Sequence, residues 1–169
     1  MGEENNMKVY FSDYINDAVR ILVLLDAGKD RKSLKMTENR IKLFDYFLKF
    51  PCTMLGDDIQ KLDAKWNFDE YYAFFHWQPD LIRYRQSLNF LIAKGFIEKV
   101  LENSSIVYKI NELGVQVLDG MNTSYKKKLV SLTNEIIPKV SKLSESAIEQ
   151  LIRKKSNLYL RAGRLKNED

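Results

Sequence analysis

Apolar residues recur three and four positions apart between residues 11 and 28, a spacing that predicts an amphipathic helix. Ser12 or Asp13 is expected to cap its first amides, and Gly28 lies where the helix should end. The polar residues 1–8 are expected to fray. The predicted buried stripe of this helix comprises Ile15, Ala18, Val19, Leu22 and Leu25.

A second helix is predicted after the charged loop "KDRKSLKM". Thr37 opens it, and Pro51 ends it because the residue before a proline is pushed toward extended backbone angles. The following residues, 52–67, have weak periodicity and are interpreted as a loop with about one turn of helix. The apolar face of the second helix is expected to comprise Ile41, Phe44, Phe47 and Leu48.

Aromatic residues concentrate in residues 68–77, "FDEYYAFFHW", which are predicted to form a helix with apolar side chains on two faces. Such a helix contacts two neighbours. Both contacts can lie within the chain, or one face can bind a partner protein, because Tyr and Trp are frequent anchors of protein interfaces. The candidate partner-binding residues are Tyr71, Tyr72, Phe74 and Trp77.

The pattern between residues 79 and 121 predicts a helix, a hairpin and another helix. Gly95 lies where the first of these helices would end in a left-handed conformation. The segments "FIEKVLE" and "IVYKI" favour strands joined by a turn at "NSS", and Asn111 can cap the next helix. The buried stripes of the two helices are predicted to be Leu81, Tyr84, Leu88, Leu91 and Ile92, and Leu113, Val117, Leu118 and Met121.

This order of elements is typical of a winged helix, so the predicted fold is mainly α with a small β-hairpin. A winged-helix-like domain is assigned to residues 1–121 and a basic helical C-terminal extension to residues 122–169. In the extension, Pro138 is expected to kink or divide a helix, and Ser146 is expected to start another through a capping box. The apolar stripe before the break comprises Leu129, Leu132, Ile136, Val140 and Leu143.

The net charge of +4 is unevenly distributed along the chain. Residues 1–121 carry 16 Lys and Arg against 18 Asp and Glu, which gives −2, whereas residues 122–169 carry 11 against 5, which gives +6. A basic tail suits nucleic acid or an acidic protein surface, and it can equally be a solvated helix face. The candidate contacts of the tail with DNA or an acidic surface are Lys126, Lys127, Lys128, Arg153, Lys154 and Lys155.

The helix before the hairpin is the one that reads DNA in many winged helices. Arg83, Arg85 and Lys94 are its candidate DNA contacts, together with the polar Gln86 and Asn89. Phe90 is expected to project among them, and the turn "ENSS" has no Lys or Arg, although neutralising phosphates supplies most of the affinity for DNA. Packing and protein binding are therefore favoured over sequence-specific DNA reading.

Catalytic chemistry finds little support in the composition. Cys52 and His76 are the one cysteine and the one histidine, and both are interpreted as structural residues. The sequence contains no phosphate-binding G-x-x-x-x-G-K-[ST] segment. We therefore predict no catalytic, cofactor-binding or metal-binding residue. The longest apolar run, "ILVLL", is too short to cross a bilayer, so a cytoplasmic location without membrane contact is expected.

Four segments together resemble a known family: "YFSDYINDAVRILVLLDAG", "RIKLFDYFLKFP", "FFHWQPDLIRYRQSLNFLIAKGFIEKV" and "VYKINELG". They are similar to the middle component of the bacterial three-component ABC/SMC-type ATPase systems, a group that includes the Lamassu defence systems. The resemblance covers roughly residues 10–121, and the basic tail is expected to lie outside it.

The resemblance implies a non-enzymatic accessory subunit of an anti-phage or anti-plasmid complex. Its partners would be an SMC-like ATPase with coiled coils and an effector, often a nuclease, whose activation it controls; DNA would be contacted through the complex. The family supplies no functional residue to carry over. Two alternatives stay open: a winged-helix transcription regulator that binds DNA as a homodimer, and a free-standing structural adaptor.

Overall fold

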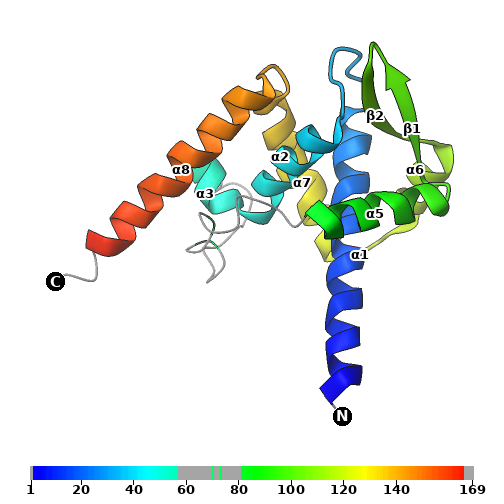
Figure 1. Ribbon diagram of the computed structural model, residues 1–169, viewed down its shortest axis with the longest axis horizontal. Coiled ribbons are helices and arrows are strands. Elements are labelled where there is room, and N and C mark those ends of the chain that lie inside the picture. The colour runs from blue at the N-terminus through cyan, green and yellow to red at the C-terminus, as the bar shows by residue number, and fades with distance from the viewer. Residues whose placement is uncertain (1, 57–69, 71–72, 74–80, 166–169) are drawn as a thin grey trace.

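A computed structural model of the chain describes residues 2–56, 70, 73 and 81–165. The described part is mainly helical with one antiparallel β-hairpin, which confirms the predicted fold class (Figure 1). In chain order the elements are α1 (Gly2–Gly28), α2 (Glu38–Lys49), α3 (Pro51–Leu55), α5 (Leu81–Ala93), β1 (Ile97–Glu102), β2 (Ser105–Ile110), α6 (Glu112–Gly120), α7 (Ser124–Val140) and α8 (Glu145–Leu165).

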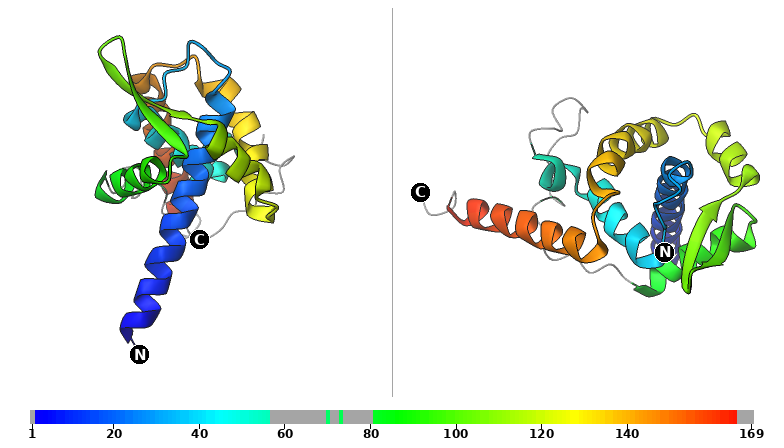
Figure 2. Two further views of the ribbon diagram at one scale, coloured as in Figure 1. Left: turned by 90° about the vertical axis from the view of Figure 1, so that its right-hand side faces the viewer. Right: turned by 90° about the horizontal axis from the view of Figure 1, so that it is seen from above.

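Helix α1 is the centre of the fold. Seen end-on in Figure 2 (right), it is surrounded by α2, α5, the hairpin, α6 and α7, all of which contact it. Residues 17–25 are therefore buried on every side, beyond the predicted stripe, whereas Ile15 lies before this stretch and is 36% exposed. The apolar residues buried here are Ala18, Val19, Ile21, Leu22, Val23, Leu24 and Leu25.

The start of α1 differs from the prediction. The helix begins at Gly2, so residues 2–8 are helical and Ser12 and Asp13 lie inside the helix. No proline interrupts these residues, and once the buried half has formed, each added residue gains a backbone hydrogen bond without a new nucleation cost. The first turns of α1 extend beyond the rest of the fold (Figure 1).

Helix α2 follows the prediction closely. The Thr37 hydroxyl accepts a hydrogen bond from the Arg40 amide at 3.1 Å, as an N-cap should. The helix ends at Lys49, but the chain then continues as α3, with Pro51 in its first turn. The segment interpreted mainly as a loop thus begins with a helix whose five residues are all buried. The predicted apolar face of α2 is buried as expected: Ile41, Phe44, Phe47 and Leu48.

Helix α5 and the hairpin have the predicted order, and Gly95 adopts a φ of +71°. Tyr84, Leu88 and Leu91 are buried, whereas Leu81 is 51% exposed, contrary to the prediction. Leu81 is the first residue of α5, and the bonds of α5 to α1 fall further along, where Arg83 binds Asp17 and the Gln86 carbonyl accepts from Tyr14.

The hairpin turn has both central residues at positive φ, Asn103 at 47° and Ser104 at 64°. This is typical of the type I′ turn, which matches the twist of the paired strands. The α1–α2 loop covers the outer edge of β2, because the Tyr108 amide donates to the Met36 carbonyl at 2.9 Å. The loop and the hairpin therefore form one continuous surface.

Helix α6 is capped as predicted, since the Asn111 side chain accepts from the Gly114 amide at 3.0 Å. Leu118 is buried, but Leu113 is 46% exposed, contrary to the prediction. The reason is the neighbouring Gly114, which packs against the Phe96 backbone. This contact turns the adjacent side chain toward solvent, because successive positions of a helix lie about 100° apart.

Gly114 is therefore expected to tolerate no side chain. A Cβ at this position would lie 2.2 Å from the Phe96 carbonyl oxygen and 2.7 Å from Ile110 Cγ1, and a backbone atom has little freedom to move aside. Gly114→Ala should lower the free energy of unfolding, measured by urea denaturation, by about 1–3 kcal/mol or more. Gly120→Ala in the same helix meets nothing within 4 Å and is the matched control, with an expected change within about 0.5 kcal/mol. Equal losses in both variants would contradict the clash.

Helices α7 and α8 pack against the rest of the fold, α7 on α1 and α2, and α8 on α2 and α3. Helix α7 runs through Pro138 and ends at Val140, so the break follows the proline by two residues. Helix α8 begins at Glu145, and Ser144, not Ser146, accepts a hydrogen bond from the Ala147 amide at 3.2 Å. The apolar residues buried in these two helices are Leu129, Leu132, Ile136, Ile137, Val140, Ile148 and Ile152.

The predicted boundary between residues 121 and 122 therefore runs through a shared hydrophobic core. Leu132 and Ile136 of α7 belong to the same cluster of buried residues as Leu22 of α1 and Phe44 of α2. This sharing argues against independent folding of the two parts, and a truncation that tests it is described in the Discussion.

Candidate interaction surfaces

A buried ionic network lies between α1 and three of its neighbours. The Arg20 guanidinium donates to Asp45 at 2.6 Å and to the Tyr125 hydroxyl at 3.1 Å, and it also pairs with Asp17. Burial works to raise the pKa of Asp45, but the charges of Arg20 and Lys49 outweigh it and hold that pKa below its usual value. The Asp45 carboxylate is therefore ionised inside the fold, which requires the cations around it.

Two of the residues that could have been surface cations belong to this network. Lys49 Nζ lies 3.0 Å from Asp45, and Arg83 Nε lies 2.6 Å from Asp17. Arg83 was a candidate DNA contact, but its guanidinium bonds α5 to α1. The network thus joins α1, α2, α5 and α7, and its role is structural.

The outer face of α5 offers DNA little. Arg85 pairs with Glu38 at 3.3 Å. Phe90, expected to project outward, is partly buried and packs edge-on against Tyr14, with ring centroids 5.2 Å apart. Lys94 is exposed, with its Nζ 5.7 Å from the centre of the Phe90 ring. Of the three predicted cations, Arg83 and Arg85 are in ion pairs with carboxylates of the same chain.

The hairpin tip carries an exposed apolar pair next to the polar turn residues 102–105. Leu101 is 73% exposed and Ile106 is 47% exposed, and the two face each other across the strands. The pair lies next to the pair that closes the turn, a position where the side chains of opposed residues come close together. The turn has no Lys or Arg, and the side chains exposed beside it are Leu101 and Ile106.

The predicted cations of the tail lie on α7 and α8, and α8 packs on α3. Lys127 and Lys128 are exposed near the start of α7, and Lys126 is partly buried. Lys128 is near enough to Cys52 of α3 for its charge to act on the thiol. These lysines lie in the first turns of α7, where the helix dipole disfavours positive charge. Their placement therefore carries a local electrostatic cost.

On α8, Arg153 and Lys154 are exposed, but Lys155 is partly buried and donates to the Met54 carbonyl of α3. Lys155 therefore holds two helices of the chain together, a role that its position in a basic run did not indicate. Cys52 itself is fully buried, and burial raises its pKa to about 11, so its thiol is unreactive as predicted.

The predicted aromatic residues Tyr71, Tyr72, Phe74 and Trp77 lie outside the described residues, as does His76. Two residues of that segment are described, and both are buried anchors. The Glu70 carboxylate accepts from the Cys52 and Thr53 amides at 2.9 and 3.0 Å, which caps the start of α3. The Ala73 carbonyl accepts from the Tyr46 hydroxyl at 2.6 Å. The segment is thus tied to α2 and α3 at two points.

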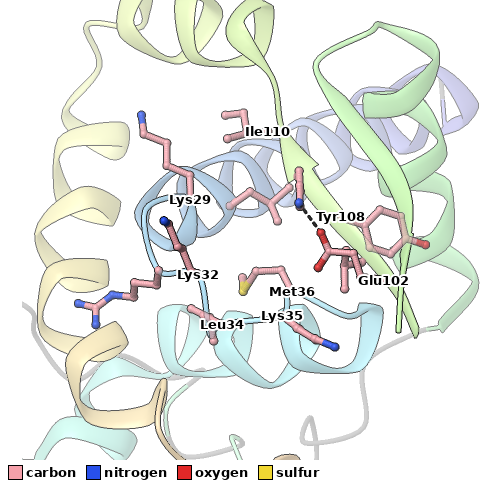
Figure 3. Close-up of a pocket in the computed structure, with 13 residues that line it drawn as sticks. Lys29, Lys32, Leu34, Lys35, Met36, Glu102, Tyr108 and Ile110 are labelled. Carbon is pink, nitrogen blue, oxygen red and sulfur yellow. Dashed lines mark ion pairs between the residues drawn. The ribbon is translucent and has the colours of Figure 1, made fainter. Parts of the chain in front are cut away.

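A pocket of about 320 Å³ lies between the α1–α2 loop and β2 (Figure 3). The sequence of this loop shows only a charged segment and gives no sign of the pocket, because the opposite wall comes from residues more than 60 positions later in the chain. The side chains that line the pocket include Lys29, Arg31, Lys32, Lys35 and Lys109 with Glu102 as charged residues, and Leu25, Leu34, Met36, Val107 and Ile110 as apolar residues.

Within residues 2–56, 70, 73 and 81–165, no group of three or more His, Cys, Asp or Glu side chains is arranged to hold a metal ion. Over the same residues, no helix is both long and apolar enough to cross a membrane.

The comparison with protein families decides the affiliation. The family model described as "ABC-three component (ABC-3C) system Middle Component 2" matches residues 10–161. The chain belongs to this family. No curated protein and no solved structure matches this middle component.

The match confirms the predicted family and corrects its extent. It continues from residue 121 to residue 161, so α7 and most of α8 lie within the region that the family model matches. The family description makes the chain an accessory subunit whose partners are the other components of a three-component ABC system.

Proposed function

We propose that this middle component is a non-catalytic, cytoplasmic subunit of a Lamassu-type anti-phage or anti-plasmid complex. In this proposal it bridges an SMC-like ATPase with coiled coils and an effector, such as a nuclease, and controls activation of the effector. DNA sensing belongs to the assembled complex, and the middle component contributes protein contacts. The family match supports an accessory subunit of a three-component ABC system. The surface of the fold supports protein binding as its role.

The observation that carries the proposal is the chemistry of the α5–hairpin face. A DNA-binding winged helix needs cations that are available to phosphates on its reading helix and on its wing. Here Arg83 and Arg85 already pair with Asp17 and Glu38, and the hairpin tip presents Leu101 and Ile106. Exposed apolar side chains of this kind are typical of protein contacts.

The order of α1, α2, α5 and the hairpin supports a winged-helix-like core, with α5 in the place of the reading helix. The α1–α2 loop supports it too, because it bonds to the outer edge of β2 through Met36 and Tyr108. We infer that this arrangement serves as a scaffold for assembly.

The hairpin tip provides the first test. Leu101→Glu combined with Ile106→Glu should reduce co-purification with the other components of the system tenfold or more, because a charge at a desolvated contact opposes binding. The thermal unfolding of the isolated subunit should change little, since both side chains are already exposed. Leu113→Glu, an exposed apolar position on α6, is the control and should leave assembly unchanged.

The alternative function is a winged-helix transcription regulator that binds DNA as a homodimer. Gln86 and Asn89 on α5, and Lys94 directly after it, are exposed and favour this alternative. It would replace the proposal if the purified protein shifted a specific duplex, if the affinity fell steeply with salt, and if Asn89→Ala removed the shift while the hairpin-tip variant assembled normally.

Two further surfaces stay predictions. The aromatic residues Tyr71, Tyr72, Phe74 and Trp77 are proposed as a second partner contact. The cations Lys126, Lys127 and Lys128 with Arg153 and Lys154 are proposed to face an acidic surface or DNA in the complex.

A further inference from the structure

The pocket between the α1–α2 loop and β2 combines an apolar interior with a cationic rim. Its volume of about 320 Å³ is at the lower end of the 300–1,000 Å³ that ligand pockets span. Leu34 and Met36 from the loop and Val107 from β2 form the interior together with Leu25 and Ile110. In Figure 3, the Met36 side chain lies between Lys32 on one side and Tyr108 on the other.

Three of the rim cations have no carboxylate partner within the described part of the chain. Lys29 pairs with Asp26 at 2.7 Å, and Lys109 pairs with Glu102. By contrast, Arg31, Lys32 and Lys35 take part in no ion pair among the described residues. Their positive charge is concentrated in a part of the sequence, residues 1–121, whose net charge is −2.

The loop that carries these cations is held in place. The Tyr108 amide donates to the Met36 carbonyl, and within the loop the Leu34 amide donates to the Arg31 carbonyl at 2.8 Å. Leu34 and Met36 are also buried, at 8% and 5% exposure. A preformed site loses less conformational entropy on binding than a site that must order first.

We propose that this pocket binds an acidic protein segment that inserts an apolar side chain. The carboxylates of the segment pair with Arg31, Lys32 and Lys35, and its apolar residue occupies the space above Met36. The inference rests on the proposed function in one respect, which is that the segment belongs to another component of the complex.

The combination of cationic and apolar side chains in the site favours protein over nucleic acid. A phosphodiester backbone supplies charge but no apolar group for the interior, whereas a leucine or phenylalanine flanked by Asp or Glu supplies both. The Tyr108 amide on the outer edge of β2 is already bonded to Met36. The segment is therefore recognised through its side chains and not by adding a strand beside Tyr108.

Photo-crosslinking in the reconstituted three-component complex tests the inference. We expect p-benzoylphenylalanine in place of Lys32 to cross-link, on irradiation, to one segment of another component, and mass spectrometry should show acidic residues around an apolar one. Arg31→Glu combined with Lys35→Glu should abolish that cross-link. In the otherwise wild-type protein, Arg31→Glu with Lys32→Glu should weaken binding of that component tenfold or more, with a loss that shrinks as salt rises.

Two controls separate charge from position. Lys139→Glu with Lys142→Glu makes the same change in net charge at exposed positions of the α7 end and should alter affinity less than twofold. A synthetic peptide of the cross-linked segment should bind the isolated subunit, and replacing its apolar residue by serine should weaken binding tenfold or more.

The outcomes distinguish this inference from the proposed function. If the complex forms but position 32 cross-links only to added duplex DNA or to nothing, or if charge reversal leaves affinity unchanged, the pocket assignment is overturned and the proposed function stands. If the wild-type protein joins no other component, both are overturned.

Discussion

A chain that ends at Met121 is expected to lose its cooperative unfolding transition. Removal of α7 and α8 deletes seven buried apolar side chains and uncovers the faces of α1 and α2 on which α7 lies. Fully burying an aliphatic side chain contributes about 1.5–3 kcal/mol, so the loss is on the order of 10 kcal/mol. The whole stability of a domain is about 5–15 kcal/mol, so little would remain.

Urea denaturation followed by circular dichroism measures this effect. A chain that ends at Leu165 is the control and should keep a cooperative transition, because it retains the whole of α8. A sharp transition in the chain ending at Met121, with a midpoint close to that of the full chain, would restore the predicted division into two independent parts.

Arg20→Met is expected to lower the free energy of unfolding by about 3–5 kcal/mol, because it leaves Asp45 and Asp17 buried with fewer cations around them. Asp45 is 2% exposed and therefore gains little from water. The depressed pKa of Asp45 implies that its stabilising contribution is present at neutral pH and is lost as the pH falls below about 4. In Arg20→Met the pKa of Asp45 should rise, so the difference in stability from the wild type should narrow as the pH falls and this carboxylate takes up a proton.

The exposed pair of Lys29 and Asp26 provides the comparison. Lys29→Ala removes an ion pair whose side chains are 42% and 33% exposed, and it should cost at most about 1 kcal/mol. Arg20→Met combined with Asp45→Leu should recover part of the loss, because it removes the stranded carboxylate together with its partner. A loss in Arg20→Met no larger than that in Lys29→Ala would show that the network contributes little.

Local chemistry made part of the fold predictable. Thr37, Asn111 and Gly95 act as predicted because a cap or a left-handed residue depends on neighbours within about four positions. The capping residue of α8 was placed two residues late, at Ser146, since serines at 144 and 146 both precede an apolar run. The family was also recognisable from sequence, because the match depends on the order of such segments.

Burial and pairing were less predictable. Ile15, Leu81 and Leu113 have the spacing of buried residues, yet they are exposed. The spacing shows which face of a helix is apolar, but it does not show how far along that face the neighbouring elements cover it. Arg83 and Lys155 resemble surface cations in the sequence, yet they bond to Asp17 and to the Met54 carbonyl. Such pairs join residues 66 and 101 positions apart.

The sequence by itself therefore determined most helices of the described part, the hairpin with its turn, most of the caps and the family. Only the tertiary structure decided that α1 lies at the centre, that the basic tail is part of the core, and that a loop of lysines meets β2 to form a pocket. The physical reason is distance along the chain. Backbone hydrogen bonds and caps form between near neighbours, whereas burial, buried ion pairs and pockets depend on which distant segments pack together.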